Sequence, residues 1–246
     1  MAGGRVTGGT LHLVGVGPGD PELLTLKAAR ILGAAAVVAY PAKGEDSALA
    51  LEIARARINP AALHLPIAIP MTVERGPARA AYDAGAEAIL SHLRAGRDVA
   101  YLCEGDPLFY GSAMYLLDRV VARAPVTVVP GITSLTAAAA AIARPLAARN
   151  ETLKILPAPL PDETLRAELA AAPAVAIIKV GRHFDRVRAL LAATGHAASA
   201  MVVEHATTKK QRITRLADFA HDERPYFSTI LCYSGGETWG NRERGE

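Results

Sequence analysis

Three loops of this sequence, each rich in glycine or proline, carry polar residues that could hold a small ligand. They are Gly15-Val-Gly-Pro-Gly-Asp20, Glu104-Gly-Asp-Pro107 and Pro130-Gly-Ile-Thr-Ser134, and each follows a short apolar run typical of a buried strand. Glycine lets a ligand approach the backbone closely, so that N–H and C=O groups can bind it. Ligands of open α/β sheets bind at the carboxyl ends of the strands. We therefore expect these loops to form a ligand site.

Asp106 is the carboxylate in this set that has two interpretations. It follows a buried strand and a glycine, and an isolated Asp-Pro pair in that position is typical of a helix cap or an Asx turn. Glu104 and the pair Thr133-Ser134 lie at equivalent strand ends, which favours a functional role. A carboxylate in such a place can bind a pair of ribose hydroxyls or a cationic amino group.

The sequence lacks the patterns of a dinucleotide site, a metal site and a serine hydrolase. The first loop has Glu22 where a dinucleotide-binding loop needs its third small residue, and the Asp20 carboxylate would repel a pyrophosphate. The 7 histidines show no metal-ligand spacing, so we expect no protein-bound metal. His183 and His205 follow predicted strands and are interpreted first as surface or loop histidines, with a position over the ligand cleft as the alternative. The sequence contains no G-x-S-x-G motif, so it does not indicate a serine hydrolase.

The composition is that of a globular protein with room for one large domain or two small ones. The chain has 246 residues, of which 51% are apolar, and a net charge of +3, which is too small to indicate nucleic-acid binding.

Cys103 and Cys232 lie in apolar runs and are expected to be free thiols in the core. The segment 1–9 lacks the apolar region of a signal peptide, and the apolar run 170–180 is too short to span a membrane, so we expect a cytoplasmic protein.

The elements that must position these loops alternate between strands and helices, which predicts an α/β fold with a mostly parallel sheet. Prolines crowd the segment around 152–156, and we place a domain boundary there, giving domains 10–148 and 149–236. The expected strands are 11–16, 35–40, 98–103, 126–129, 174–180, 199–204 and 227–233, and the expected helices are 22–32, 47–56, 79–95, 110–122, 134–143, 163–171 and 184–193.

Four stretches in this order and spacing resemble the tetrapyrrole methyltransferases, enzymes that use S-adenosylmethionine (SAM). They are residues 14–27, 104–112, 129–134 and 203–212, and the resemblance runs from about residue 10 to residue 233. It implies two α/β domains, each with a central mixed or mostly parallel sheet, and SAM folded in the cleft between them. It also implies a homodimer.

Within the family, the chain is similar to the members that methylate C20 of precorrin-2 in cobalamin biosynthesis. The cues are Tyr40-Pro41 followed by 44–47, and the runs 102–111, 179–183 and 225–228; the uroporphyrinogen enzymes usually carry a second glycine where Glu104 stands. An alternative function is that of the anaerobic counterpart, which methylates cobalt-factor II at the same carbon. A diphthine or ribosomal-RNA methyltransferase of the same fold and a non-catalytic tetrapyrrole carrier also stay open.

The resemblance implies which residues hold the two substrates. Methylation by an electron-rich meso carbon needs in-line positioning more than a strong nucleophile, and no catalytic residue is assigned. Arginines suit the many carboxylates of a precorrin-2-class substrate, and Arg149, Arg182 and Arg212 are the candidates. The SAM contacts carried over from the family, many of them backbone contacts, are Pro18, Glu104, Gly105, Asp106, Phe109, Thr133, Ser134, Val180 and Ala206.

Overall fold

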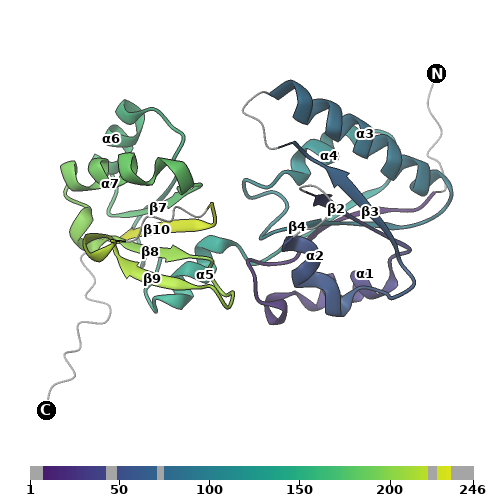
Figure 1. Ribbon diagram of the computed structural model, residues 1–246, viewed down its shortest axis with the longest axis horizontal. Helices are drawn as coiled ribbons and strands as arrows, with labels where there is room; N and C mark the ends of the chain where they lie inside the picture. Colours follow the sequence, from purple (N-terminus) through teal and green to yellow (C-terminus); the bar gives the residue numbers. More distant parts are fainter. Residues whose placement is uncertain (1–7, 43–48, 71–74, 221–225, 234–246) are drawn as a thin grey trace, which may run out of the picture. The chain divides into compact units, whose positions relative to one another are not determined.

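A computed structural model describes residues 8–42, 49–70, 75–220 and 226–233 (Figure 1). Contacts divide the chain into two compact units, Met1–Thr133 and Ser134–Glu246. Each unit contains a five-stranded sheet with helices against it, so the expected pair of α/β domains with a mostly parallel and a mixed sheet is confirmed. The cue residues 44–47 and 225 and the domain residues 234–236 lie outside the described part.

The first unit is built on a sheet of parallel strands in the order β3-β2-β4-β1-β5. Its strands are β1 (Leu11–Gly15), β2 (Val37–Ala42), β3 (Leu63–Ala68), β4 (Val99–Cys103) and β5 (Val126–Val129). Its helices are η1 (Pro21–Leu23), α1 (Leu26–Ala34), α2 (Leu49–Ala54), η2 (Arg55–Arg57), α3 (Arg75–Arg94) and α4 (Ala113–Val120).

Both faces of this sheet are buried, which explains the nearly continuous apolar runs of its central strands. In β4, Val99, Tyr101 and Cys103 join the core under α3 and α4, whereas Ala100 and Leu102 join the core under α1 and α2. This alternation is the two-residue period of a strand. Figure 1 shows the two helix pairs on opposite faces of the sheet.

The second unit has a mixed sheet in the order β6-β7-β10-β8-β9, in which β10 is antiparallel to both of its neighbours. Its apolar core lies between this sheet and α6 and α7, while α5 lies on the other face (Figure 1). The strands are β6 (Leu153–Pro157), β7 (Ala174–Ile178), β8 (Met201–Glu204), β9 (Arg212–Arg215) and β10 (Ser228–Tyr233). The helices are α5 (Ser134–Ala141), α6 (Asp162–Ala170), η3 (Gly181–His183), α7 (Phe184–Ala193), η4 (Ala197–Ser199) and η5 (Leu216–Asp218).

Three of the four edge strands, β3, β6 and β9, were not among the expected strands, and β3 and β9 share a cause. Each pairs on one side only, and most of their residues are exposed. Edge strands often carry charges and proline, which removes the apolar pattern by which a strand is recognised. Arg212 and Arg215 in β9 and Pro66 in β3 are examples.

The helix expected at 22–32 has two beginnings rather than one. Asp20 accepts a hydrogen bond from the Glu22 N–H at 2.8 Å and begins the short turn η1. Thr25 then accepts one from the Ala28 N–H at 3.1 Å and begins α1. Both residue types are good N-caps. The sequence analysis placed the start of a single helix near Asp20 and did not predict the second start at Thr25.

Contacts place the division between the units before α5, N-terminal to the expected boundary at 149, because the segment after α5 is tied to β10. The Arg144 guanidinium donates to the carbonyls of Ser199 (3.1 Å) and Tyr233 (3.3 Å), and the Tyr233 hydroxyl donates to Glu151 at 2.8 Å. α5 also packs against β10. The chain therefore joins the second unit well before the proline-rich segment.

Both cysteines are free and buried, as expected, and this gives the first prediction. Burial raises the pKa of Cys232 to about 12 and raises that of Cys103 further still. The native protein should therefore react negligibly with a thiol reagent at pH 8, since the thiolate is the nucleophile. The same protein in guanidinium should react at both thiols, as a spectrophotometric thiol assay would show. Rapid reaction of the native protein would contradict the buried positions.

Candidate functional site

The loops after β1 and β4 are joined by a short backbone bridge. The Gly105 N–H donates to the Gly17 carbonyl at 2.8 Å, and the Gly17 N–H donates back to the Gly105 carbonyl at 3.3 Å. The strands place them there, since Gly15 pairs with Cys103 in the parallel register. Gly17 (φ 81°) and Gly105 (φ 66°) both have the left-handed backbone that favours glycine.

Asp106 joins the second loop to the third. One carboxylate oxygen accepts the Leu108 N–H at 2.8 Å, which forms a turn within its own loop. The other accepts the Gly131 N–H at 3.0 Å, in the loop after β5. Both oxygens are thus used in holding backbone, and Asp106 is a positioning residue for this part of the site.

Three glycines let these loops touch. A Cβ on Gly131 would lie 2.0 Å from the Gly105 carbonyl oxygen, and one on Gly15 would lie 2.7 Å from the Gly131 backbone. Gly105 itself differs, because the nearest atoms to its Cβ position are the Ile132 oxygen at 3.8 Å and the Thr133 Cα at 4.0 Å. A Cβ there would thus be in ordinary van der Waals contact with the third loop, and what favours glycine at 105 is its left-handed backbone.

The structure thus brings together most of the site residues expected in the first unit. Gly105, Asp106 and Thr133 lie on joined loops, and Pro18 directly follows the bridging Gly17. Glu104 precedes the bridge and is half-buried. Phe109 is half-buried in the same loop, where its ring makes an edge contact with Tyr110 at 5.1 Å between centroids.

In the second unit, Val180 and Ala206 occupy matching positions. Since β7 and β8 are both antiparallel to β10, they run in the same direction and end on the same side of the sheet. Each strand is followed by a left-handed residue, Lys179 (φ 57°) or His205 (φ 47°), and then by the expected contact residue. Val180 is 0% and Ala206 8% exposed. Small buried residues there are consistent with contacts through the backbone.

The remaining expected residues of this unit lie in different places. Arg182 is exposed in η3 after β7, and Arg212 is exposed at the start of β9, paired with Glu204. Both are at the end of the sheet where β7 and β8 finish. Arg149 is exposed ahead of β6, at the opposite end of the sheet, and Ser134 is exposed as the first residue of α5.

Lys179 and His205 were not among the expected site residues. Lys179 is a single charged residue between the apolar strand β7 and Val180-Gly181. This charge within an apolar run is the feature of the sequence that could have indicated a site residue. His205 begins a loop held by internal hydrogen bonds. The Thr208 hydroxyl donates to the His205 carbonyl at 2.9 Å, and the Thr207 N–H donates to the Gln211 side chain at 2.7 Å.

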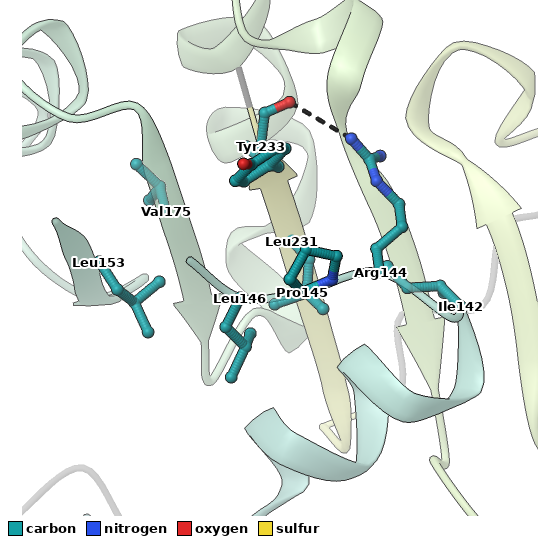
Figure 2. A pocket seen from close by; sticks show the side chains of 9 residues that line it. Ile142, Arg144, Pro145, Leu146, Leu153, Val175, Leu231 and Tyr233 are labelled. Atoms are coloured by element: carbon teal, nitrogen blue, oxygen red, sulfur yellow. Dashed lines mark hydrogen bonds between the residues drawn. The ribbon is translucent and has the colours of Figure 1, made fainter. Parts of the chain in front are cut away.

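A small cavity lies elsewhere in the second unit, beside the Arg144 hydrogen bond to Tyr233 (Figure 2). It is lined mainly by apolar side chains and has a volume of about 10 Å³, which leaves no room for a ligand the size of SAM. Among the described residues, no group of three or more His, Cys, Asp or Glu side chains could hold a metal ion. In that same part of the chain, no helix is long and apolar enough to cross a membrane.

Comparison with known proteins gives the class of protein. Residues 10–219 match the family of Tetrapyrrole (Corrin/Porphyrin) Methylases, and the chain belongs to that family. A precorrin-2 C(20)-methyltransferase of Sinorhizobium sp is 43% identical over 231 residues, which cover 91% of this chain and 94% of that protein. A cobalt-precorrin-2 C(20)-methyltransferase of Salmonella typhimurium is 33% identical, with 91% and 95% covered.

A cobalamin biosynthesis protein of Mycobacterium tuberculosis is 43% identical over 92% of this chain, and the chain spans 46% of that protein's length, about half. Among solved structures, a cobalt precorrin-4 methyltransferase superposes with a TM-score of 0.75 at 26% identity, covering 95% of this chain and 98% of that one. A uroporphyrin-III C-methyl transferase from Thermus thermophilus, complexed with S-adenyl homocysteine, has a TM-score of 0.67 at 28% identity, with 92% of each chain covered.

The hydrogen bonds of Asp106 give a second prediction. In Asp106→Asn, one amide group must face an N–H donor, so one of the two bonds is lost, at a cost of about 1–3 kcal/mol in the free energy of unfolding. The loops should loosen, and the affinity for SAM should fall. Thermal unfolding and calorimetric titration with SAM would measure both effects.

Asp98→Asn is the matched control, since Asp98 accepts the Thr10 N–H at 2.7 Å at the other end of β4. Its amide oxygen can still accept this single N–H, so the variant should keep both the stability and the SAM affinity of the wild type. Unchanged SAM affinity in Asp106→Asn would contradict the positioning role.

Proposed function

We propose that this protein transfers the methyl group of SAM to C20 of precorrin-2, giving precorrin-3A in cobalamin biosynthesis. The observation that carries the proposal is the 43% identity to the Sinorhizobium precorrin-2 C(20)-methyltransferase along nearly the whole of both chains. The joined loops of the first unit support it, since glycines bring their backbones together at strand ends in a family of tetrapyrrole methylases.

We propose that SAM is held chiefly by backbone groups at strand ends. The residues are those expected from the sequence: Pro18, Glu104, Gly105, Asp106, Phe109, Thr133, Ser134, Val180 and Ala206. The bridge between Gly17 and Gly105 and the Asp106 bond to Gly131 fix the loops before any ligand binds. Such a fixed site supports methyl transfer by orienting the reactants.

SAM supplies a methyl group on a sulfonium sulfur. The C20 electron pair forms the new bond to the methyl carbon while the sulfur–methyl bond breaks, and sulfur keeps that electron pair. C20 then loses its proton to a base. Because the substrate's conjugated ring supplies the electron density, the chain needs no activated serine or cysteine. This agrees with the raised pKa of Cys103, the cysteine next to the Glu104 loop.

We propose a homodimer from the family resemblance, and the cytoplasmic location stays a prediction of the sequence. Of the other functions considered, a non-catalytic tetrapyrrole carrier has least support, since the strand-end loops keep the glycines that allow close approach. The cobalt-loaded substrate is the second candidate, and the 33% identity to the Salmonella enzyme favours it.

Turnover with defined substrates tests this proposal. Incubation with precorrin-2 and SAM carrying a ¹³C-labelled methyl group should yield a product one methyl substitution heavier, with the label at C20 in its NMR spectrum. The control is the same assay with cobalt-loaded substrate, and a higher kcat/KM for that substrate would favour the second candidate. Methylation at another carbon, or none with either substrate, would contradict both.

The arginine proposal has its own test. If Arg149, Arg182 or Arg212 binds a substrate carboxylate, its change to Ala should raise the KM for the tetrapyrrole several-fold and leave kcat nearly unchanged. We expect Arg182→Ala and Arg212→Ala to show the larger effects, because both lie where β7 and β8 end and Arg149 does not. Steady-state kinetics at saturating SAM would measure this. Three unchanged KM values would rule out the proposal.

A further inference from the structure

Lys179 and His205 keep long polar side chains at positions where glycine would fit the backbone better. Their φ angles of 57° and 47° are in the left-handed region, where a side chain strains the backbone. Gly181, two residues after Lys179, has a positive φ of 34° as well. Strain of this kind tends to persist where the side chain itself has a function.

The fold places the two residues as a pair. Ile230 of β10 pairs with Ile177 on one side and with Val202 on the other, so β7 and β8 end at nearly the same level. Lys179 and His205 each follow the last residue of their strand. Two strand spacings separate them, about 10 Å. Two carboxylates on different rings of a macrocycle can span such a separation.

The surroundings of the pair suit a flat, anionic ligand. Exposed cations lie at the same end of the sheet, and the exposed Phe227 ring lies beside His205, with the exposed Tyr226 ring next to Phe227. The His205 ring is 6.3 Å from the Phe227 ring, and Phe227 makes an edge contact with Tyr226 at 5.2 Å. The exposed cations are Arg182, Lys209, Lys210 and Arg212, and the nearby acids are Asp185, which is exposed, and Glu204, which is buried.

We propose that Lys179 and His205 bind two carboxylates on different rings of the tetrapyrrole substrate and so fix its orientation. This inference rests on the proposed function, because it assigns a recognition role within that site. The loop at His205 supports it, since the internal hydrogen bonds of Thr207 and Thr208 hold the histidine backbone in place.

Variants that keep the backbone and change the side chain test the pair. Lys179→Met keeps the length and removes the charge, Lys179→Arg keeps the charge, and His205→Asn tolerates the left-handed backbone. The KM for precorrin-2 should rise about 10-fold in Lys179→Met and in His205→Asn, as for a lost hydrogen bond to a charged group. Lys179→Arg should stay near wild type, kcat should change little, and the Kd for SAM should be unchanged.

Ala143→Asn is the control for substitution at a left-handed position, since Ala143 (φ 51°) lies after α5, away from this end of the sheet. Its KM should equal that of the wild type. Unchanged KM in both Lys179→Met and His205→Asn, with wild-type turnover intact, would overturn the inference and leave the proposed function standing. A rise in the Kd for SAM without a rise in KM would also overturn it.

A second readout separates the inference from the proposed function. If the wild type does not methylate precorrin-2, the proposed function fails, and binding of a porphyrin octacarboxylate, followed by absorbance titration, then tests the pair. Weaker binding by Lys179→Met and His205→Asn than by Ala143→Asn would support the inference. Equal binding by all the variants would overturn it.

Discussion

The candidate SAM site of the first unit depends on close backbone contact between loops that follow neighbouring parallel strands. The Gly105 carbonyl lies against Gly17 on one side and against Gly131 on the other, and at Gly131 a single methyl group would prevent the contact. Parallel pairing makes this possible, since it brings the carboxyl ends of β4, β1 and β5 together. The sheet therefore sets the positions of the loops, and the glycines let them meet.

The hydrogen bonds by which Asp106 holds the loops together could also be its contribution to ligand binding. Its two carboxylate oxygens hold the Leu108 and Gly131 N–H groups, which matches the simple interpretation of an Asp-Pro turn. The bond to Gly131 also fixes the third loop, in which the Thr133 Cα lies beside Gly105. A ligand bound at Gly105 would thus depend on Asp106 even without touching it.

The sequence predicted those parts of the fold that are governed by burial and local turns. The buried strands β1 and β4 lie within a residue of their expected bounds, and the edge strand β5 and helix α7 have the bounds expected. The edge strands β3 and β9 were missed because exposed, charged or proline-containing segments lack the apolar pattern. The left-handed backbone of Lys179 and His205 was not predictable from residue type, because lysine seldom adopts it and only the surrounding structure imposes it.

The two units therefore shape their strand ends by different means. In the first, glycine removes side chains so that backbones touch and a ligand can approach. In the second, the strand ends keep side chains in a strained conformation and bury the next residue, Val180 or Ala206. A SAM-dependent methylation of an electron-rich carbon asks a protein mainly for orientation, so both devices serve it without a catalytic nucleophile. Under the proposed function, the glycine-lined loops would hold SAM through backbone groups, and Lys179 and His205 would bind the tetrapyrrole.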